Sequence, residues 1–176
     1  MKGAASSFGI VTAFYFQTEA APAGAVSFSV VIPDSEKATV AQRVKIYQSM
    51  QTYGSSAPGE IALQLLLTNT TFAISGVYWG SLQEYEAAIA PFSALLPAGT
   101  TFKPTEANWI DTLISQSGAT TLEVPLTGYN QHNTFFAKSL ITSKQHALTD
   151  QQLTSFFNYI ATQGNTSGYV STRCAL

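Results

Sequence analysis

The sequence IALQLLL at residues 61–67 is followed, after four intervening residues, by FAISGVYW at residues 72–79. The first run is apolar enough for a buried strand, and the second is rich in β-branched and aromatic residues. Asn69 and Thr70 lie between the runs and are the expected turn. The two runs therefore predict a β-hairpin, and the rest of the fold is predicted outward from it.

A strongly marked helix follows the hairpin. Ser81 and Glu84 have the spacing of a capping box, in which each side chain bonds the backbone N–H of the other residue. Behind this box the apolar residues recur at helical spacing: Leu82, Tyr85, Ile89, Phe92 and Leu96. Pro97 is expected to end the helix, because proline cannot continue the hydrogen-bond ladder.

Two strands and a helix are predicted before the hairpin. Residues 10–16 are β-branched and aromatic, and residues 26–30 alternate apolar side chains with Ser27 and Ser29, so each segment predicts a strand. The segment Pro33-Asp34-Ser35 offers an N-cap for a helix that carries Val40, Val44 and Tyr47 on one face, with Gly54 as its C-cap.

After Pro97 the pattern is more varied. Residues 101–103 predict a short strand and residues 105–115 a helix, and residues 117–131 read as a long loop. Residues 135–141 are compatible with a strand or a helix. A last helix is expected from Thr149 to Gly164, and a final strand over residues 168–173. Paired strands alternating with amphipathic helices predict an α+β fold: an antiparallel β-sheet with helices packed on one face.

Composition excludes several classes of function. The chain has 176 residues, of which 10% are charged, and its net charge is −2. No cluster of basic residues suggests nucleic-acid binding, and no run is long and apolar enough for a membrane span. The single cysteine, Cys174, excludes an internal disulfide, and the two histidines lack partners at metal-ligand spacing, so no metal site is expected. The first residues lack the apolar core of a signal peptide.

Two segments carry a resemblance to a known family. Small residues precede Phe8-Gly9-Ile10-Val11-Thr12, and this stretch resembles the end of the flavin-binding domain in the vanillyl-alcohol oxidase superfamily. Ala5 and Ser7 stand where that family usually has glycine and asparagine. The segment Phe136-Ala137-Lys138-Ser139-Leu140 resembles the substrate domain of fungal gluco- and chitooligosaccharide oxidases, within the berberine-bridge-enzyme-like group, and the helix that carries Phe156, Phe157 and Tyr159 fits the same domain.

The resemblance implies a domain division and a cofactor. Residues 1–20 would end the FAD-binding domain, and residues 21–176 would form part of the substrate-binding domain, which is expected to be incomplete. FAD is the expected cofactor of the parent family, and the missing part of the flavin domain is the expected packing partner. The residues implied to lie against FAD are Gly3, Ser7, Gly9, Ile10 and Val11, because small residues let the backbone approach a ligand closely.

The resemblance also implies a substrate site and a reaction. Phe136 and Lys138 would line the groove for an oligosaccharide, whose anomeric hydroxyl would be oxidised to a lactone with oxygen as the acceptor. The histidine and cysteine that link FAD in the family, and its catalytic tyrosine, have no counterpart in this sequence. We therefore expect a fragment that is inactive by itself, from a fungal, secreted flavoprotein. Glycosylation acceptors are predicted at Asn69 and Asn165.

The residues leave an alternative open. The chain could be a stand-alone α+β module that binds a ligand or a partner without catalysis. Its low charge and high apolar content would then reflect a binding face. No nucleophile elbow or local pair of carboxylates supports a different catalytic reading.

Overall fold

The computed structural model describes residues 9–10, 12–18, 20–68, 71–123, 146–163 and 170–174. Within this part of the chain, the regular elements lie in the expected order from residue 25 onward, with one additional 3-10 helix. They are β1 (Ala25–Val31), the 3-10 helix η1 (Ser35–Lys37), α2 (Val40–Gly54), β2 (Ile61–Leu67), β3 (Phe72–Tyr78), α3 (Leu82–Leu95), β4 (Thr101–Ala107), α4 (Trp109–Ser117), α5 (Asp150–Gln163) and β5 (Val170–Cys174).

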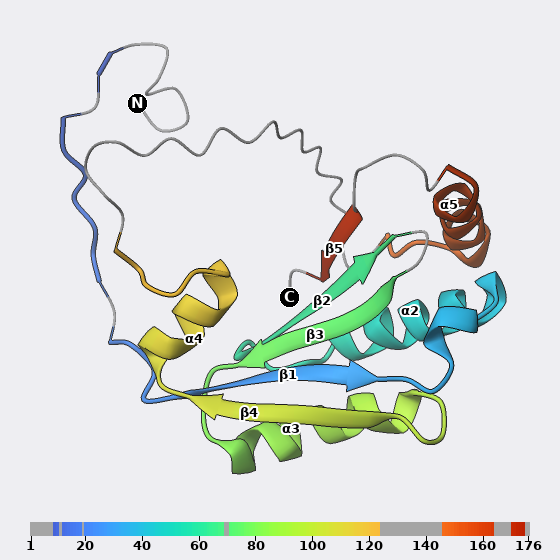
Figure 1. Ribbon diagram of the computed structural model, residues 1–176, viewed down its shortest axis with the longest axis horizontal. Coiled ribbons are helices and arrows are strands. Elements are labelled where there is room, and N and C mark those ends of the chain that lie inside the picture. The colour runs from blue at the N-terminus through green and yellow to red at the C-terminus, as the bar shows by residue number, and fades with distance from the viewer. Residues whose placement is uncertain are drawn as a thin grey trace.

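The strands form one antiparallel sheet. Their order is β4-β1-β3-β2-β5, and each neighbouring pair is antiparallel. The predicted β2–β3 hairpin is confirmed, with Ile61 opposite Tyr78 and Leu67 opposite Phe72. Figure 1 shows the sheet crossing the molecule with β4 at one edge and β5 at the other. The predicted α+β class, with an antiparallel sheet, is therefore confirmed.

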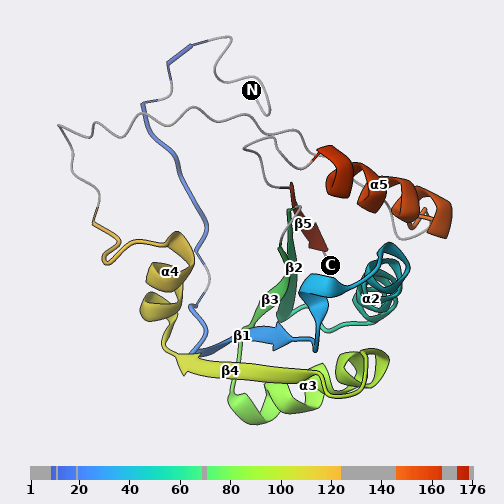
Figure 2. The same ribbon diagram turned by 45° about the vertical axis from the view of Figure 1, so that its right-hand side comes forward.

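Three helices cover one face of the sheet. In Figure 2 the helices α2, α3 and α5 lie on the same side of the strands, whereas α4 lies on the other side, near the start of β1. At that end Ala25 is almost fully buried, although it points away from the other helices. The prediction of helices packed on one face is thus confirmed for the three that bury the core.

The core lies between this helical layer and the sheet. Side chains alternate along a strand, so every second residue points toward the helices. On β1, β2 and β3 these residues are buried: Val26, Phe28, Val30, Ile61, Leu63, Leu65, Leu67, Phe72, Ile74 and Tyr78. The helices add Met50, Phe92 and Phe157, each fully enclosed. The alternation predicted over residues 26–30 is confirmed, with Ser29 exposed on the opposite face.

The start of α2 differs from the prediction. Asp34 adopts a left-handed backbone with φ 52° and leads into the short η1 turn instead of capping a long helix. The N-cap is Thr39, whose hydroxyl accepts from the N–H of Gln42 while the Gln42 amide oxygen accepts from the N–H of Thr39. This capping box satisfies the N–H groups of Thr39 and Gln42, whereas the Asp34 side chain makes no capping hydrogen bond, so α2 begins after Thr39.

The helix α3 is as predicted. The Ser81 and Glu84 capping box is formed in both directions, and Tyr85, Ile89, Phe92 and Leu96 are buried against the sheet. The last helical residue is Leu95, directly before the Leu96 cap and Pro97. Local capping and periodicity agree with the tertiary contacts here, which is why the sequence indicates this element so clearly.

The strand predicted over residues 10–16 is wrong for the described residues of that segment. They have no regular structure and pair with no described strand. Phe14 and Phe16 stack with ring centroids 5.9 Å apart, yet both are exposed, and Tyr15 is 98% exposed. The β-branched and aromatic composition was a correct sign of β-propensity, but a strand also needs a neighbour to satisfy its backbone groups.

The boundary between β4 and α4 also lies later in the sequence than predicted. The predicted short strand over residues 101–103 extends to Ala107, so the predicted helix over residues 105–115 begins only at Trp109, after the Asn108 N-cap. Pro104 lies inside β4, which is an edge strand of the described sheet. An edge strand tolerates proline because one side of its backbone has no strand to bond.

The C-terminal elements follow the prediction where the structure describes them. Thr149 caps α5 through a box with Gln152, and Leu153 and Phe157 are buried. The final strand β5 ends at Cys174, one residue later than predicted, and the predicted first residues of the strand, 168 and 169, lie outside the described residues. Residues 135–141, Gly164 and most of the predicted loop after Glu123 lie outside the described residues. Within the described part, no helix is long and apolar enough to cross a membrane.

Candidate functional site

The sheet has a second face that α2, α3 and α5 do not cover, which we call the open face. It is formed by the residues that alternate with the core: Ala25, Ser27, Ser29 and Val31 of β1, Ala62, Gln64 and Leu66 of β2, Ala73, Ser75 and Val77 of β3, and Thr101, Lys103, Thr105 and Ala107 of β4. Ser29, Ser75 and Lys103 are exposed on it. A face with so many small and hydroxyl-bearing residues differs sharply from the apolar face behind it.

One row of the open face is polar across all five strands. Ser29 lies opposite Lys103 on one side and Ser75 on the other. Ser75 lies opposite Gln64, and Gln64 opposite the position of Arg173. We call these five positions the polar row. Two serines at its centre leave a shallow floor, and residue types with longer polar side chains occupy the positions toward both edges.

The chemistry that the polar row offers is hydrogen bonding. Serine hydroxyls donate and accept, and the glutamine amide and lysine ammonium add further donors. The described positions of the open face carry no aspartate, glutamate, tyrosine or histidine. This surface is therefore suited to binding and orienting a polar ligand through hydrogen bonds.

Two tryptophans bound the open face where α4 packs. Trp79 directly follows β3, and Trp109 is the first residue of α4. Their ring centroids are 4.9 Å apart at an interplanar angle of 52°, and both are partly buried. Close by, the Glu106 carboxylate accepts a hydrogen bond from the N–H of Leu82, which ties β4 to the start of α3. The two rings therefore form a packed aromatic contact at this end of the face.

The tyrosines that contact the core lie on the other side of the sheet. Burial raises the pKa of Tyr85 to about 12, with smaller contributions from Tyr53 and Glu86. Burial also raises the pKa of Tyr53 and of Tyr78. Phenols with raised pKa values remain protonated at neutral pH and make poor bases. Their place is in the core, away from the polar row.

The structure describes two of the five residues predicted to bind FAD. Gly9 and Ile10 are exposed, and the Ile10 side chain is 94% accessible. A Cβ added at Gly9 would meet nothing within 4 Å. The backbone here is open to a group from outside the described chain, which fits the predicted role without testing it. Gly3, Ser7 and Val11 lie outside the described residues.

The other predicted site residues also fall outside this part of the chain: Phe136, Lys138, Asn69 and Asn165. The described residues on either side of Asn69 and Thr70 are joined by hydrogen bonds. The N–H of Thr68 donates to Thr71 O, and the N–H of Thr71 donates to Thr68 Oγ1, both at 2.9 Å. The glycosylation sites stay predictions. No group of metal-ligating side chains is present among the described residues.

Sequence reasoning missed the polar row. The serines at 27 and 29 were visible as the outer face of a strand, and Ser75 alternates with apolar residues in the same way. Which of these serines lie side by side depends on the pairing of β1 with β3, and these strands are more than 40 residues apart in the chain. Spacing within one strand does not determine that register.

No family model matches the chain. Among curated proteins, the FAD-linked oxidoreductase sorD of Penicillium rubens is 30% identical over 177 aligned positions, which span all of this chain and 36% of sorD. The xylooligosaccharide oxidase of Thermothelomyces thermophilus is 30% identical over 81% of the chain and 28% of its own length. The chitooligosaccharide oxidase of Gibberella zeae is 27% identical over 96% of the chain and 33% of its own length.

Solved structures of oligosaccharide oxidases have a similar fold over this part of their chains. A chitooligosaccharide oxidase superposes with a TM-score of 0.75 at 24% identity, over 90% of this chain and 33% of that one. A xylooligosaccharide oxidase from Myceliophthora thermophila C1, in complex with xylobiose, superposes with a TM-score of 0.70 at 25% identity, over 89% and 33%. The chain thus spans about a third of the length of the curated relatives it matches.

Proposed function

The chain is related by sequence and fold to the FAD-linked oligosaccharide oxidases, and from this relationship we propose that it forms part of the substrate-binding domain of an FAD-dependent carbohydrate oxidase. In this proposal residues 1–20 end the flavin-binding domain, and residues 21–176 belong to the substrate-binding domain. The open face of the sheet is the surface turned toward the sugar and toward the rest of the protein.

The observation that carries the proposal is the polar row. An oligosaccharide presents many hydroxyl groups, each able to donate and accept a hydrogen bond, and the Ser29, Ser75 and Gln64 side chains match that chemistry. Small side chains at the centre leave space for a ring to lie flat. A surface of this kind stabilises a polar ligand by several weak hydrogen bonds rather than by one strong anchor.

FAD, where bound, would supply the hydride acceptor for this reaction, with oxygen as the final electron acceptor. The proposed reaction converts the anomeric hydroxyl of an oligosaccharide to a lactone. The residues of this chain that would lie against the cofactor are Gly3, Ser7, Gly9, Ile10 and Val11. The open backbone around Gly9 supports that placement. The part that we assign to this chain is binding and orientation, because the described open face offers hydroxyl, amide and ammonium groups.

We therefore propose that the chain is inactive by itself. It would become part of an active site only together with a flavin domain that packs against the open face and the segment near Ile10. Phe136 and Lys138 would complete the sugar groove. If the protein enters the secretory pathway, Asn69 and Asn165 would be the glycan acceptors.

The alternative is a stand-alone module that binds a ligand or partner without catalysis. Its supporting observation is the same open face, which could serve either purpose. The exposed Phe14, Tyr15 and Phe16 favour the first proposal, because an apolar segment with no described neighbour is expected where another part of the protein packs. The two proposals differ in whether a flavin domain restores activity.

The purified chain should show no flavin absorbance and no sugar-dependent release of peroxide. Adding xylobiose should shift the amide NMR signals of Ser29, Ser75 and Gln64 more than those of α2 or α3. Replacing both serines by valine keeps strand propensity and removes the hydroxyls, and should weaken sugar binding about threefold or more. Thr101→Val, at the edge of the same face, is the matched control and should leave binding unchanged.

Each alternative outcome has a distinct meaning. Bound flavin together with sugar-dependent peroxide would show that the chain is active alone and would overturn the inactive-fragment proposal. Sugar-induced shifts confined to the helical face would overturn the assignment of the open face. Restoration of peroxide release by a separately produced flavin domain of a relative would distinguish the oxidase proposal from the binding module.

A further inference from the structure

A cleft lies on the helical side of the molecule, away from the open face. It is lined where three elements meet: the residues after β1, the first half of α2 and the end of α3. Its volume is about 390 Å³. Pockets that hold small ligands have volumes of about 300–1,000 Å³, so this cleft is large enough for a small molecule.

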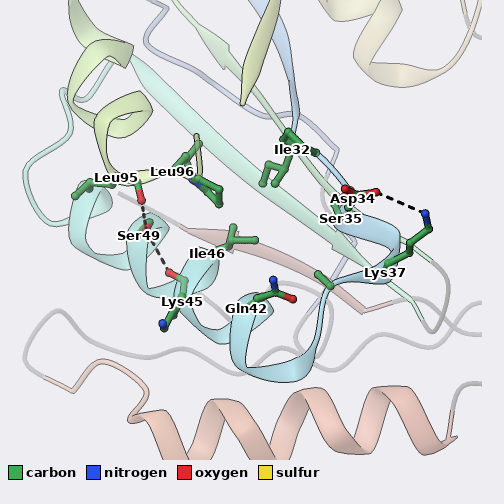
Figure 3. A pocket seen from close by; sticks show the side chains of 13 residues that line it. Ile32, Asp34, Ser35, Lys37, Gln42, Lys45, Ile46, Ser49, Leu95 and Leu96 are labelled. Carbon is green, nitrogen blue, oxygen red and sulfur yellow. Dashed lines mark hydrogen bonds and ion pairs between the residues drawn. The ribbon is translucent and has the colours of Figure 1, made fainter. Parts of the chain in front are cut away.

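The floor of the cleft is apolar. Ile32, Ile46 and Leu96 are buried and line it together with Pro33 and Pro97. Figure 3 shows the Ile32, Ile46 and Leu96 side chains directed into the same space from their three elements. No aromatic side chain is present among the lining residues, so the flat stacking surface that sugar rings favour is missing.

The walls are fixed by hydrogen bonds. Ser49 Oγ lies 2.9 Å from Leu95 O and 3.1 Å from Lys45 O, which ties α2 to the end of α3, as the dashed lines in Figure 3 show. The turn after α3 is closed by a bond from the N–H of Thr100 to Pro97 O. Gly99 in that turn has φ 82° and lies close to Pro33, so the opposite wall is also constrained.

The rim offers donors and positive charge. The Gln42 amide oxygen is occupied by the N–H and hydroxyl of Thr39, and no described residue accepts from its Nε2 group. Figure 3 shows this amide below Ile46 at the edge of the cleft. Lys37 and Lys45 also line the cleft, against one acid, Asp34, which lies 3.6 Å from the Lys37 ammonium. The rim therefore carries a net positive charge.

We propose that this cleft binds a small aliphatic carboxylate. The apolar chain would lie on the floor formed by Ile32, Ile46 and Leu96. The carboxylate would accept a hydrogen bond from Gln42 Nε2 and would be attracted by Lys37 and Lys45. An apolar floor with a few donors and a positive rim is complementary to an amphipathic anion and offers little to a neutral polyol.

The capping box provides a sharp test. Gln42→Glu keeps the oxygen that accepts from Thr39, and glutamate is a normal residue at this capping position. The same change puts a carboxylate where the proposal requires a donor. Gln152→Glu is the matched control, because Gln152 has the same capping role with Thr149 at the start of α5, outside the cleft. Circular dichroism checks that both variants fold.

The measurement is the affinity of the full chain for hexanoate, from titration followed by NMR or calorimetry. We expect saturable binding that perturbs Ile32, Ile46 and Leu96. Gln42→Glu should weaken it about fivefold to tenfold, as expected for one repulsive charge near the ligand, whereas Gln152→Glu should leave it unchanged. Lys37→Gln should weaken binding about twofold to threefold, and Lys103→Gln on the open face should have no effect.

Three results would overturn the proposal: no saturable binding of hexanoate, equal affinity for hexan-1-ol and hexanoate, or equal effects of the two glutamine substitutions. Equal affinity for the alcohol would mean that the cleft recognises apolar surface alone, as a docking place for another part of a longer protein would. The outcome is independent of the sugar titration, since the two ligands are assigned to opposite sides of the sheet.

Discussion

The ring of Phe28 occupies the space where a side chain at Gly76 would lie. The two residues are opposite each other in the β1–β3 pair. A Cβ added at Gly76 would be 2.4 Å from Phe28 Cζ and 2.4 Å from the carbonyl oxygen of Ala62. The Phe28 ring cannot move away freely, because Tyr85 and Phe102 pack against it with ring centroids 5.0 and 6.4 Å away.

Gly76→Ala should therefore destabilise the protein by about 2–4 kcal/mol, since a contact with backbone cannot be relieved by a rotamer change and the ring is enclosed. Gly59→Ala is the control, because a Cβ there meets nothing within 4 Å. It should change stability by less than about 1 kcal/mol. Urea unfolding of both variants measures the difference, and equal values would show that the sheet relaxes around Gly76.

Tyr85 and Tyr53 should respond oppositely to removal of their hydroxyls. The Tyr85 hydroxyl is buried without a hydrogen-bond partner, whereas Tyr53 donates to Ala88 O at 2.9 Å. Tyr85→Phe removes an uncompensated desolvation cost and should stabilise the fold by about 1 kcal/mol. Tyr53→Phe removes a satisfied bond and should destabilise it by about 1 kcal/mol. The free energies of unfolding in urea give both signs, and destabilisation by Tyr85→Phe would contradict the buried, unpaired hydroxyl.

Alkaline pH should unfold the protein in a window set by the same tyrosine. Burial raises the pKa of Tyr85 from 10.0 to about 12, so the folded state holds this proton more tightly than the unfolded chain. The stability that this difference contributes is fully present below pH 10 and is lost as the pH rises toward 12. The slope from this group is at most about 1.4 kcal/mol per pH unit. Tyr85→Phe should make the loss of stability between pH 10 and 12 less steep. An unchanged slope would show that other groups cause this loss.

The elements that the sequence predicted well are those whose local signals and tertiary contacts agree. The β2–β3 hairpin and α3 follow from periodicity and capping, and the structure confirms both. The start of α2 was misplaced because Asp34 and Thr39 are both good capping residues. Only Thr39 has a glutamine three residues later to complete the box. The Thr39 and Gln42 spacing is visible in the sequence and was not used in the prediction.

The candidate site was harder to predict than the fold. The polar row joins residues from five strands, and its order β4-β1-β3-β2-β5 brings together Lys103 and Ser29, which lie far apart in the chain. That juxtaposition depends on strand order and register, which long-range packing decides. The strand prediction around Tyr15 was wrong for a related reason, because high β-propensity produces a strand only where a neighbouring strand is available to pair with it.

The cap of α3 should make stability depend on pH in the acidic range. The Glu84 carboxylate accepts hydrogen bonds from the backbone N–H and from the hydroxyl of Ser81. Both bonds lower the pKa of Glu84 below 4.5, and the bond from the backbone N–H has the larger effect. The folded state therefore favours the ionised form. Its contribution is present above pH 4.5 and is lost as the pH falls through the lowered pKa.

Ser81→Ala should cost about 1 kcal/mol at neutral pH, because the N–H of Glu84 loses the hydroxyl that caps it. It should also reduce the acid dependence that Glu84 contributes. Ser93→Ala is the control in the same helix and should change stability by less than about 0.5 kcal/mol. Thermal unfolding at several acidic pH values separates the two effects. A Ser81→Ala variant as stable as Ser93→Ala would show that the box does not hold the start of α3.

The ring of Phe157 is one of the two fully buried side chains that attach α5 to the described core, with Leu153 as the other. Phe157 is 1% exposed and lies between Tyr47 of α2 and Phe72 of β3, with ring centroids 6.2 and 6.1 Å away. A hydrogen bond from Gln48 to Asp150 joins the same two helices at the surface. Phe157→Ala should destabilise the fold by about 3–4 kcal/mol, since it leaves a cavity between helix and sheet. Tyr159→Ala, at a position that is 62% exposed on the same helix, is the matched control and should cost less than about 1 kcal/mol. Hydrogen exchange distinguishes local from global loss: exchange that quickens only in α5 would show that this helix opens independently of the sheet, whereas a uniform increase would show that Phe157 belongs to the cooperative core.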